Sequence, residues 1–133
     1  MAGRQKYRQI FAALETREQD ILNRISAGRT LASIAHDLGV HRPTLSAWLA
    51  GDEARAERYA LAKKAGAAAI AEDVVAIADA STRETVAADR LRVDARTWLA
   101  GRWDPETFGD RPGVAVNVDL GDLFLRAHRE EGV

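Results

Sequence analysis

The sequence predicts a mainly α-helical protein with an amino-terminal helix-turn-helix domain, a central antiparallel helical hairpin and a short carboxy-terminal β-strand. Residues 31–50 place apolar, small and turn residues where two short, steeply crossing helices require them. Residues 53–78 are rich in alanine, contain no proline and predict one long helix. Residues 114–120 alternate between apolar and smaller or polar side chains, as a strand does. The predicted domains are residues 1–51, 52–112 and 113–133.

A short amphipathic helix is predicted close to the amino terminus. Its apolar residues recur at helical spacing, and they are Tyr7, Ile10, Phe11 and Leu14. Three basic residues precede most of this stripe, namely Arg4, Lys6 and Arg8. These basic residues either belong to the helix or form a flexible arm, because the first residues of a chain are often poorly ordered.

The next helix is predicted to pack behind the helix-turn-helix unit. Thr16 and Gln19 have the spacing of a capping box, which would start this helix. An apolar stripe follows, formed by Ile21, Leu22 and Ile25, and it ends near Gly28.

The first helix of the helix-turn-helix unit is predicted from Leu31 to Leu38. The hydroxyl of Thr30 can accept a hydrogen bond from a free amide of the first turn. Ala35 is small where the second helix must cross closely. Gly39 follows the last turn, where the backbone needs a positive φ that glycine adopts without a clash.

The second helix of the unit is predicted to present its amino terminus to DNA. Pro43 suits the first turn, and Leu45 and Trp48 face the core at a three-residue spacing. Such a helix enters the major groove with its amino-terminal residues leading. The predicted DNA-binding residues are Arg29, Thr30, His41, Arg42, Thr44, Ser46 and Ala47, together with Arg4, Lys6 and Arg8. A small helical bundle whose outer face meets only water is the alternative.

Charge is distributed unevenly along the chain. Residues 1–51 hold seven basic and four acidic residues, a net charge of +3, whereas the remainder has a net charge of −4. Positive charge therefore gathers on the segment predicted to contact phosphates. Because +3 is modest for one copy, we expect several linked copies to bind together.

The central hairpin is predicted to pair two helices closely. Gly66 and the alanines around it allow a second helix to approach. Ser81 and Glu84 form another capping-box candidate, from which a helix would run to about Arg102.

More apolar surface is present on this hairpin than one partner helix can cover. Leu91, Ala95 and Trp98 form one stripe of the second helix, and Val86, Val93 and Leu99 extend beyond it. Excess apolar surface of this kind is usually buried against another copy. The predicted oligomerisation residues are Ile70, Val74, Ile77, Val86, Leu91, Val93 and Trp98, with Val114, Val116 and Val118 of the strand.

One segment resembles a known family. Residues 89–111 contain Arg92, Asp94 and Arg96 at a set spacing, then Trp98, and then Pro105, Phe108, Gly109 and Asp110. This pattern resembles the end of the central helical domain in the small terminase subunits of tailed double-stranded DNA bacteriophages. Many relatives have tyrosine and lysine where this chain has Phe108 and Arg111. The order of the three predicted domains agrees with the same family, so the resemblance covers nearly the whole chain.

The resemblance implies a protein that recognises viral DNA for packaging into the procapsid. It implies a ring of about 8 to 11 copies, with DNA-binding domains outside and with carboxy-terminal strands that close a barrel between subunits. The expected partners are double-stranded viral DNA and the large terminase subunit, which supplies the ATPase and nuclease. Leu123, Phe124 and Leu125 are the expected large-subunit contacts, unless this tail only packs on the barrel or is disordered. The expected location is the host cytoplasm, and the protein is not expected in the mature virion.

Several functional classes are disfavoured by the sequence. The chain has no cysteine, which excludes disulfides and thiol catalysis and suggests an intracellular setting. It contains no apolar run of about 20 residues, the length of a membrane span. No phosphate-binding loop motif or cluster of metal ligands is present, so we expect no enzyme, cofactor or metal site. Two rival functions remain: a dimeric helix-turn-helix transcriptional regulator and an assembly protein that binds no nucleic acid.

Overall fold

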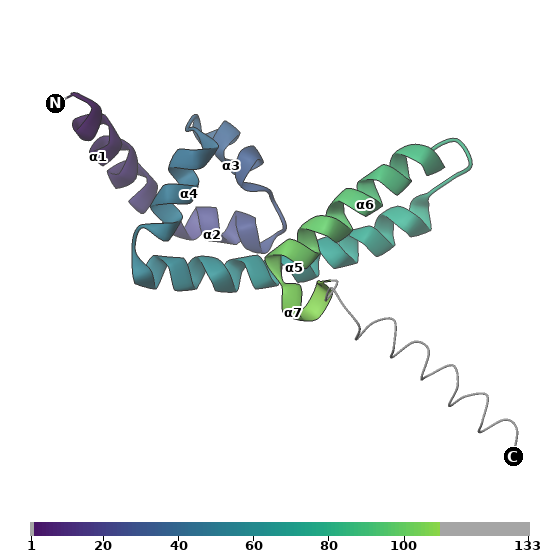
Figure 1. Cartoon of the computed structure of the whole chain (residues 1–133). Coiled ribbons are helices and arrows are strands. Elements are labelled where there is room, and N and C mark those ends of the chain that lie inside the picture. The colour runs from purple at the N-terminus through teal and green to yellow at the C-terminus, as the bar shows by residue number, and fades with distance from the viewer. Residues whose placement is uncertain (1, 110–133) are drawn as a thin grey trace, which may run out of the picture.

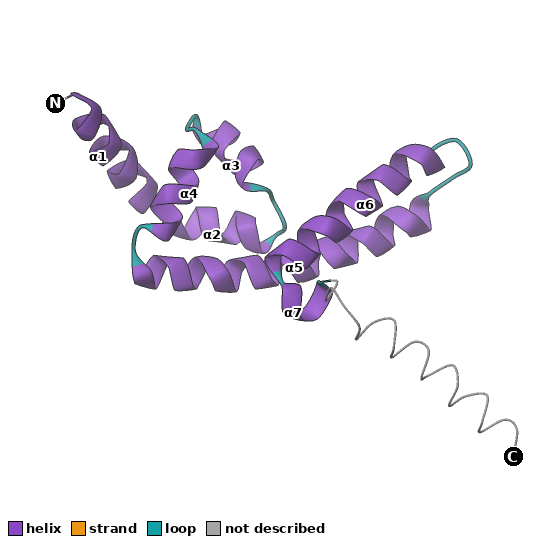
Figure 2. Cartoon of the chain, viewed as in Figure 1, coloured by secondary structure: helices purple, strands orange, loops and turns teal. Residues whose placement is uncertain are grey.

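The computed structural model describes residues 2–109, which fold into seven helices (Figure 1). Figure 2 shows that helices and short connections make up this whole described range. The mainly helical fold class is therefore confirmed for these residues. The helices are α1 (Ala2–Glu15), α2 (Glu18–Ser26), α3 (Leu31–Leu38), α4 (Arg42–Ala50), α5 (Glu53–Ala80), α6 (Val86–Trp103) and α7 (Pro105–Phe108).

Helices α2, α3 and α4 form a three-helix module around one apolar core. Its fully buried side chains are Ile21, Ile25, Ile34, Leu45, Trp48 and Leu49. Thr30 begins α3 by accepting a hydrogen bond from the Ser33 amide at 3.1 Å. Gly39 ends it with φ +70°, a conformation that glycine adopts without a side-chain clash. Both predicted ends of α3 are thus confirmed.

Helix α5 connects this module to the hairpin. Its first half packs against α2 and α4, and its second half pairs with α6 (Figure 1). Asp52 begins α5 by accepting a hydrogen bond from the Arg55 amide at 3.0 Å. Because α5 is continuous across both contacts, one rigid element joins the module to the hairpin.

Gly66 is the point at which three helices meet. A Cβ atom built on Gly66 would overlap the backbone oxygen of Ile25 and would lie 2.7 Å from Cζ3 of Trp103. The predicted close approach at Gly66 is therefore real, and it brings both α2 and the end of α6 against α5.

Two predicted helix starts are wrong. Thr16 does not cap α2, because its hydroxyl donates to the Ala13 carbonyl and α2 begins at Glu18. Ser81 does not start α6 but ends α5, and the chain then makes a turn before α6 begins at Val86. In that turn the Thr82 amide donates to the Thr85 hydroxyl at 3.0 Å. The capping-box spacing is a short local signal. Here the Thr16 hydroxyl bonds back to α1, and the turn before α6 is held by Thr82 and Thr85 and not by the Ser81 hydroxyl.

Helix α1 already begins at Ala2, so Arg4, Lys6 and Arg8 lie on a helix and not in a flexible arm. Leu14 is buried, and Ile10 and Phe11 pack against the core of the module. The first turns of α1 extend away from the other helices (Figure 1).

The third predicted domain lies outside the described residues. This applies to the strand with Val114, Val116 and Val118 and to the tail with Leu123, Phe124 and Leu125. Within residues 2–109, no helix is long and apolar enough to cross a membrane.

Candidate nucleic-acid interface

The outer face of α4 is exposed because its inner face fills the module core. Leu45, Trp48 and Leu49 are fully buried, so α4 cannot rotate without losing this packing. The other face presents the predicted groove-contacting residues. His41, Arg42 and Ala47 are exposed, and Thr44 and Ser46 are half-buried. The structure thus places these five residues along the amino-terminal two thirds of one helix, away from its buried face.

The amino terminus of α4 is open. His41 precedes the helix and gives it no side-chain cap, and Pro43 occupies its first turn. Amides of the first turn of a helix have no partner within that helix, and the helix dipole places partial positive charge there. Arg42 adds a full charge at the same place. This end of α4 therefore favours an anion such as a DNA phosphate.

Arg42 acts electrostatically on Tyr59 of α5. Burial raises the pKa of the Tyr59 phenol, and the positive charge of Arg42 acts against that rise. The Lys63 ammonium lies 4.5 Å from the Tyr59 ring centroid. Sequence reasoning gave Lys63 no role in a basic surface, since it belongs to a helix predicted only for oligomerisation.

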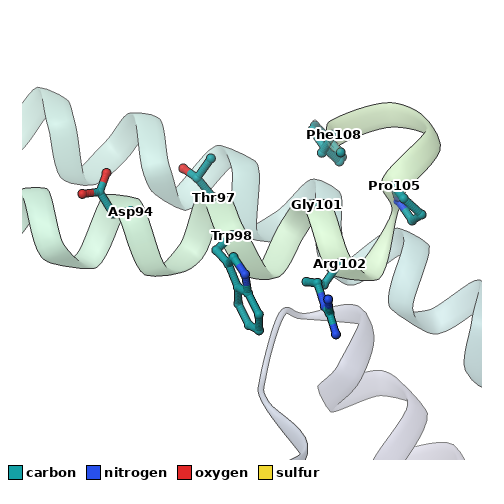
Figure 3. A pocket seen from close by; sticks show the side chains of 8 residues that line it. Asp94, Thr97, Trp98, Gly101, Arg102, Pro105 and Phe108 are labelled. Atoms are coloured by element: carbon teal, nitrogen blue, oxygen red, sulfur yellow. The ribbon is translucent and has the colours of Figure 1, made fainter. Parts of the chain in front are cut away.

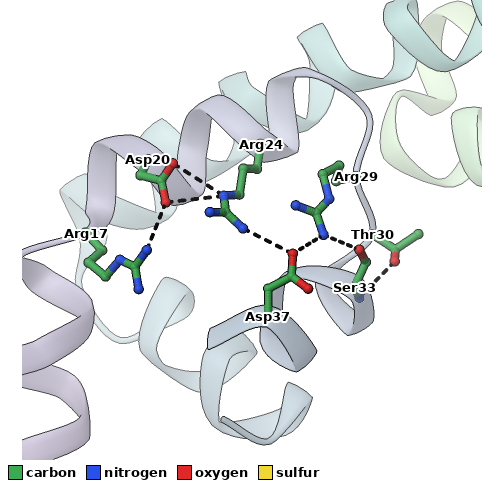
Figure 4. A network of polar contacts seen from close by, with 7 residues as sticks. All are labelled: Arg17, Asp20, Arg24, Arg29, Thr30, Ser33 and Asp37. Atoms are coloured by element: carbon green, nitrogen blue, oxygen red, sulfur yellow. Dashed lines mark hydrogen bonds and ion pairs between the residues drawn. The ribbon is translucent and has the colours of Figure 1, made fainter. Parts of the chain in front are cut away.

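Arg29 and Thr30 lie in the connection between α2 and α3 and already have partners in the chain (Figure 4). Arg29 donates from Nη2 to Asp37 Oδ2 at 2.6 Å and also to the Ser33 hydroxyl. Thr30 uses its hydroxyl to cap α3. The structure therefore places these two predicted DNA-binding residues at the surface, and each of them also has a hydrogen-bond partner within the chain.

A row of ion pairs extends from Arg29 across α2 and α3. Arg24 contacts Asp37 at 3.3 Å and Asp20 at 3.2 Å, and Arg17 contacts Asp20 at 3.6 Å (Figure 4). The hydrogen bond from Arg29 holds the pKa of Asp37 below its ordinary value, with the charges of Arg29 and Arg24 acting in the same direction. The pairs of Asp20 with Arg17 and Arg24 have the i,i+3 and i,i+4 spacing of one helix, whereas Asp37 joins the row only because α3 packs against α2. Sequence reasoning missed the role of Asp37 for that reason.

Arg55 fixes the end of α4 to α5. Its side chain is 9% exposed, its Nε donates to the Trp48 carbonyl at 2.7 Å, and its guanidinium lies 4.4 Å from the Trp48 ring centroid. A cation suits the carboxy-terminal end of a helix, where backbone oxygens lack partners. Arg55 thus sets how the recognition helix sits on α5.

The basic residues of α1 are exposed but belong to a separate surface. Arg4, Lys6 and Arg8 lie on the turns of α1 that extend away from the module. The structure does not bring them together with the open end of α4.

The hairpin exposes part of the apolar surface predicted for oligomerisation. Leu91 is 71% exposed, Trp98 64% and Val86 54%. Val74, Ile77 and Val93 are half-buried between the helices. Ile70 corrects the prediction, because it is 3% exposed and packs against Gly28 within its own chain.

Trp98 lies at a surface pocket of about 460 Å³ at the end of α6. The pocket is lined by Asp94, Thr97, Trp98, Gly101, Arg102, Pro105, Phe108 and Gly109. In Figure 3, Trp98 and Arg102 extend from the same side of α6, with the Arg102 guanidinium 5.2 Å from the Trp98 ring centroid. Of the three aromatic residues at this end of the chain's described part, Trp103 packs inside, whereas Trp98 and Phe108 remain at the surface.

Helix α5 has a second exposed apolar face that sequence reasoning missed. Leu61 is 70% exposed and Val75 is 59% exposed. Ala65, Ala68 and the charged Glu72 lie exposed between them at helical spacing. The alanine-rich composition hid this stripe, because alanine marks no particular face of a helix.

Comparisons with known proteins agree on one family. The family model described as "Bacteriophage Sf6, terminase small subunit-like" matches residues 14–115. A solved structure of a point variant of the terminase small subunit gp1 of the bacterial virus Sf6 is 33% identical, with a TM-score of 0.64, and the match covers 75% of this chain and 79% of that chain. Two further variants of gp1 are 34% and 35% identical, each with a TM-score of 0.62 and coverage of 73% and 77%. No curated protein sequence matches the chain.

Proposed function

Because the chain belongs to the Sf6 terminase small subunit-like family, we propose that it recognises viral DNA and presents it to the large terminase subunit for packaging into the procapsid. The large subunit supplies the ATPase and nuclease, and this chain acts without catalysis of its own. This activity takes place in the host cytoplasm, and the protein does not remain in the mature virion.

One observation carries the DNA-binding part of this proposal. The open amino terminus of α4 and the exposed Arg42 lie at the same end of a helix whose inner face is fixed in the module core. A helix-turn-helix module reads DNA with this end of its second helix. Arg42, Thr44 and Ser46 then meet the major groove, and Arg29, Thr30 and His41 meet phosphates. Arg4, Lys6 and Arg8 add contacts to the backbone from α1.

The hairpin assembles the ring. A closed ring uses a head-to-tail interface, in which two different surfaces of the chain meet. The hairpin has two such surfaces: the α6 face with Leu91 and Trp98, and the α5 face with Leu61 and Val75. We propose that the α6 face of one copy packs against the α5 face of the next, in a ring of about 8 to 11 copies. Val86 extends the same α6 face, and Val74, Ile77 and Val93 support it from within the hairpin.

The proposed division of labour follows the three predicted domains. Residues 1–51 bind DNA, residues 52–112 form the ring, and residues 113–133 close it with a barrel of strands and contact the large subunit. In this proposal Val114, Val116 and Val118 belong to the barrel, and Leu123, Phe124 and Leu125 to the contact with the large subunit.

Binding of the full chain to a fluorescent DNA duplex at increasing salt tests the DNA-binding part. Arg42→Ala should weaken binding by about 1 to 3 kcal/mol if Arg42 contacts a base, and should leave the mass of the assembly unchanged. Arg83→Ala, in the exposed turn between α5 and α6, removes the same charge far from α4 and should have little effect. Equal binding by both variants would refute the assignment of α4. Failure of the wild-type protein to bind duplex even at low salt would favour an assembly protein that binds no nucleic acid.

A further inference from the structure

Two arginines of the DNA-binding module converge on a single carboxylate oxygen. Asp37 Oδ2 accepts from Arg29 Nη2 at 2.6 Å and from Arg24 Nη1 at 3.3 Å (Figure 4). The two arginines come from different segments, since Arg24 lies on α2 and Arg29 lies in the connection that follows it. Asp37 lies on the face of α3 that points toward both.

This cluster lies where related modules contact DNA. In three-helix modules of the homeodomain type, the connection between the first two helices contacts the DNA backbone. Arg29 lies in the equivalent connection here. A guanidinium binds a carboxylate and a phosphate with the same planar, charge-assisted geometry. A carboxylate that already holds Arg29 therefore competes with DNA for the same donors.

We propose that Asp37 takes the place of a DNA phosphate in the free protein and releases Arg29 when DNA binds, so that this one carboxylate limits the affinity of the module. The inference rests on the proposed DNA-binding function. It adds a residue, Asp37, that lowers the affinity of the module for DNA. In a ring of many copies, a weak contact in each module keeps DNA exchangeable while the assembly as a whole stays bound.

The ion pair is weak enough for DNA to displace. The side chains of Arg29 and Asp37 are 36% and 44% exposed. Exposed pairs of this kind change an equilibrium constant by at most about fivefold. Breaking the Arg29–Asp37 pair therefore lowers the affinity of each module for DNA by a small but measurable factor.

The test compares duplex binding by the wild-type full chain and by Asp37→Asn, which keeps the shape of the side chain and removes its charge. The variant should bind a fluorescent duplex up to about fivefold more tightly. Its affinity should also fall more steeply with salt, by about one additional released counterion for each freed arginine that reaches a phosphate.

Two controls separate this mechanism from a general effect of charge. Glu15→Gln removes one negative charge at the end of α1, where the described structure shows no ion pair. Its gain in affinity should be smaller than that of Asp37→Asn. In an Arg24→Ala, Arg29→Ala background the gain from Asp37→Asn should disappear. Equal gains in the two single variants, or a gain that persists without the arginines, would overturn the inference.

A measurement on the wild-type protein covers the case in which Asp37→Asn folds poorly. The carboxyl pKa of Asp37, followed by NMR, should rise when duplex is added, because Arg29 leaves and phosphates approach. An unchanged pKa with duplex bound contradicts the inference alone. A wild-type protein that binds no duplex at low salt contradicts the proposed function instead.

Discussion

Arg55 shows how much of this fold depends on single residues. It is a buried cation, and its one short hydrogen bond goes to the Trp48 carbonyl at the end of α4. Buried polar groups that lose their partner cost more than the hydrogen bond contributes. Sequence reasoning placed Arg55 on a helix but gave it no role, because nothing local indicates that it folds back onto α4.

Arg55→Ala should lower the free energy of unfolding by about 1 to 3 kcal/mol, since it removes the buried hydrogen bond to the Trp48 carbonyl, which then accepts only from the Gly51 amide, and removes the cation over the Trp48 ring. Arg58→Ala is the matched control. Arg58 forms an exposed ion pair with Glu18 at 2.9 Å, and such pairs contribute at most about 1 kcal/mol. Urea unfolding at one fixed protein concentration measures both variants. Similar losses in the two variants would show that Arg55 does not secure α4.

A second single residue, Asp37, makes the stability of the fold depend on pH. Because the hydrogen bond from Arg29 lowers its pKa in the folded protein, the pair stabilises the fold fully above the unfolded value of about 3.8 and ceases to do so as the pH falls through the lower folded value. Acidification from pH 7 to 5 should therefore leave this pair intact. An NMR titration should place the Asp37 carboxyl below 3.8 in the wild type and nearer 3.8 in Arg29→Ala. A wild-type value at or above 3.8 would be inconsistent with the ion pair.

At the scale of elements, the helix-turn-helix unit was predictable and its surroundings were less so. Thr30, Gly39 and Pro43 act on the backbone within one helical turn of themselves, so their effect can be read from neighbouring residues. The contacts of Asp37 with Arg24 and Arg29, and the exposure of Leu61, depend on how helices pack, which neighbouring residues do not specify. For the same reason, two capping-box patterns predicted helix starts that turn contacts override.

Gly66→Ala tests the contact that joins three of these elements. Alanine normally stabilises the interior of a helix relative to glycine by about 0.5 to 1 kcal/mol. At position 66 the added Cβ meets the Ile25 backbone and the Trp103 ring, so we expect a loss of about 1 to 3 kcal/mol. Gly3→Ala is the control, because a Cβ there meets nothing within 4 Å. Thermal unfolding that shows a gain at both positions would contradict the packing at Gly66.

At the scale of the whole molecule, apolar side chains of α5 and α6 remain exposed in a single copy of residues 2–109. They are Leu91 and Trp98 on α6 and Leu61 and Val75 on α5. In the proposed ring, each of these two faces packs against the other kind of face on the next copy. The sequence predicted the α6 face from its stripe of large residues, but it assigned Ile70 to an interface between copies when that side chain packs within its own chain.

Trp98→Ser should break this assembly into smaller species without loss of helix content, because Trp98 fills the largest exposed part of the α6 face. Tyr7→Ser is the matched control, since it removes an aromatic side chain that is 57% exposed on α1 and not on the hairpin. Sedimentation velocity with circular dichroism follows both properties. The account is wrong about the interface if Trp98→Ser assembles like the wild type, or if Tyr7→Ser disassembles equally.

The most direct test of the central claim is the mass of the wild-type assembly in solution, measured by light scattering or native mass spectrometry. The account predicts one closed species of about eight or more copies of the 14.5 kDa chain, stable on dilution. A dimer would indicate a transcriptional regulator with paired half-sites, and a monomer at high concentration would show that these apolar faces need no partner. Either result would contradict a ring that carries many DNA-binding modules.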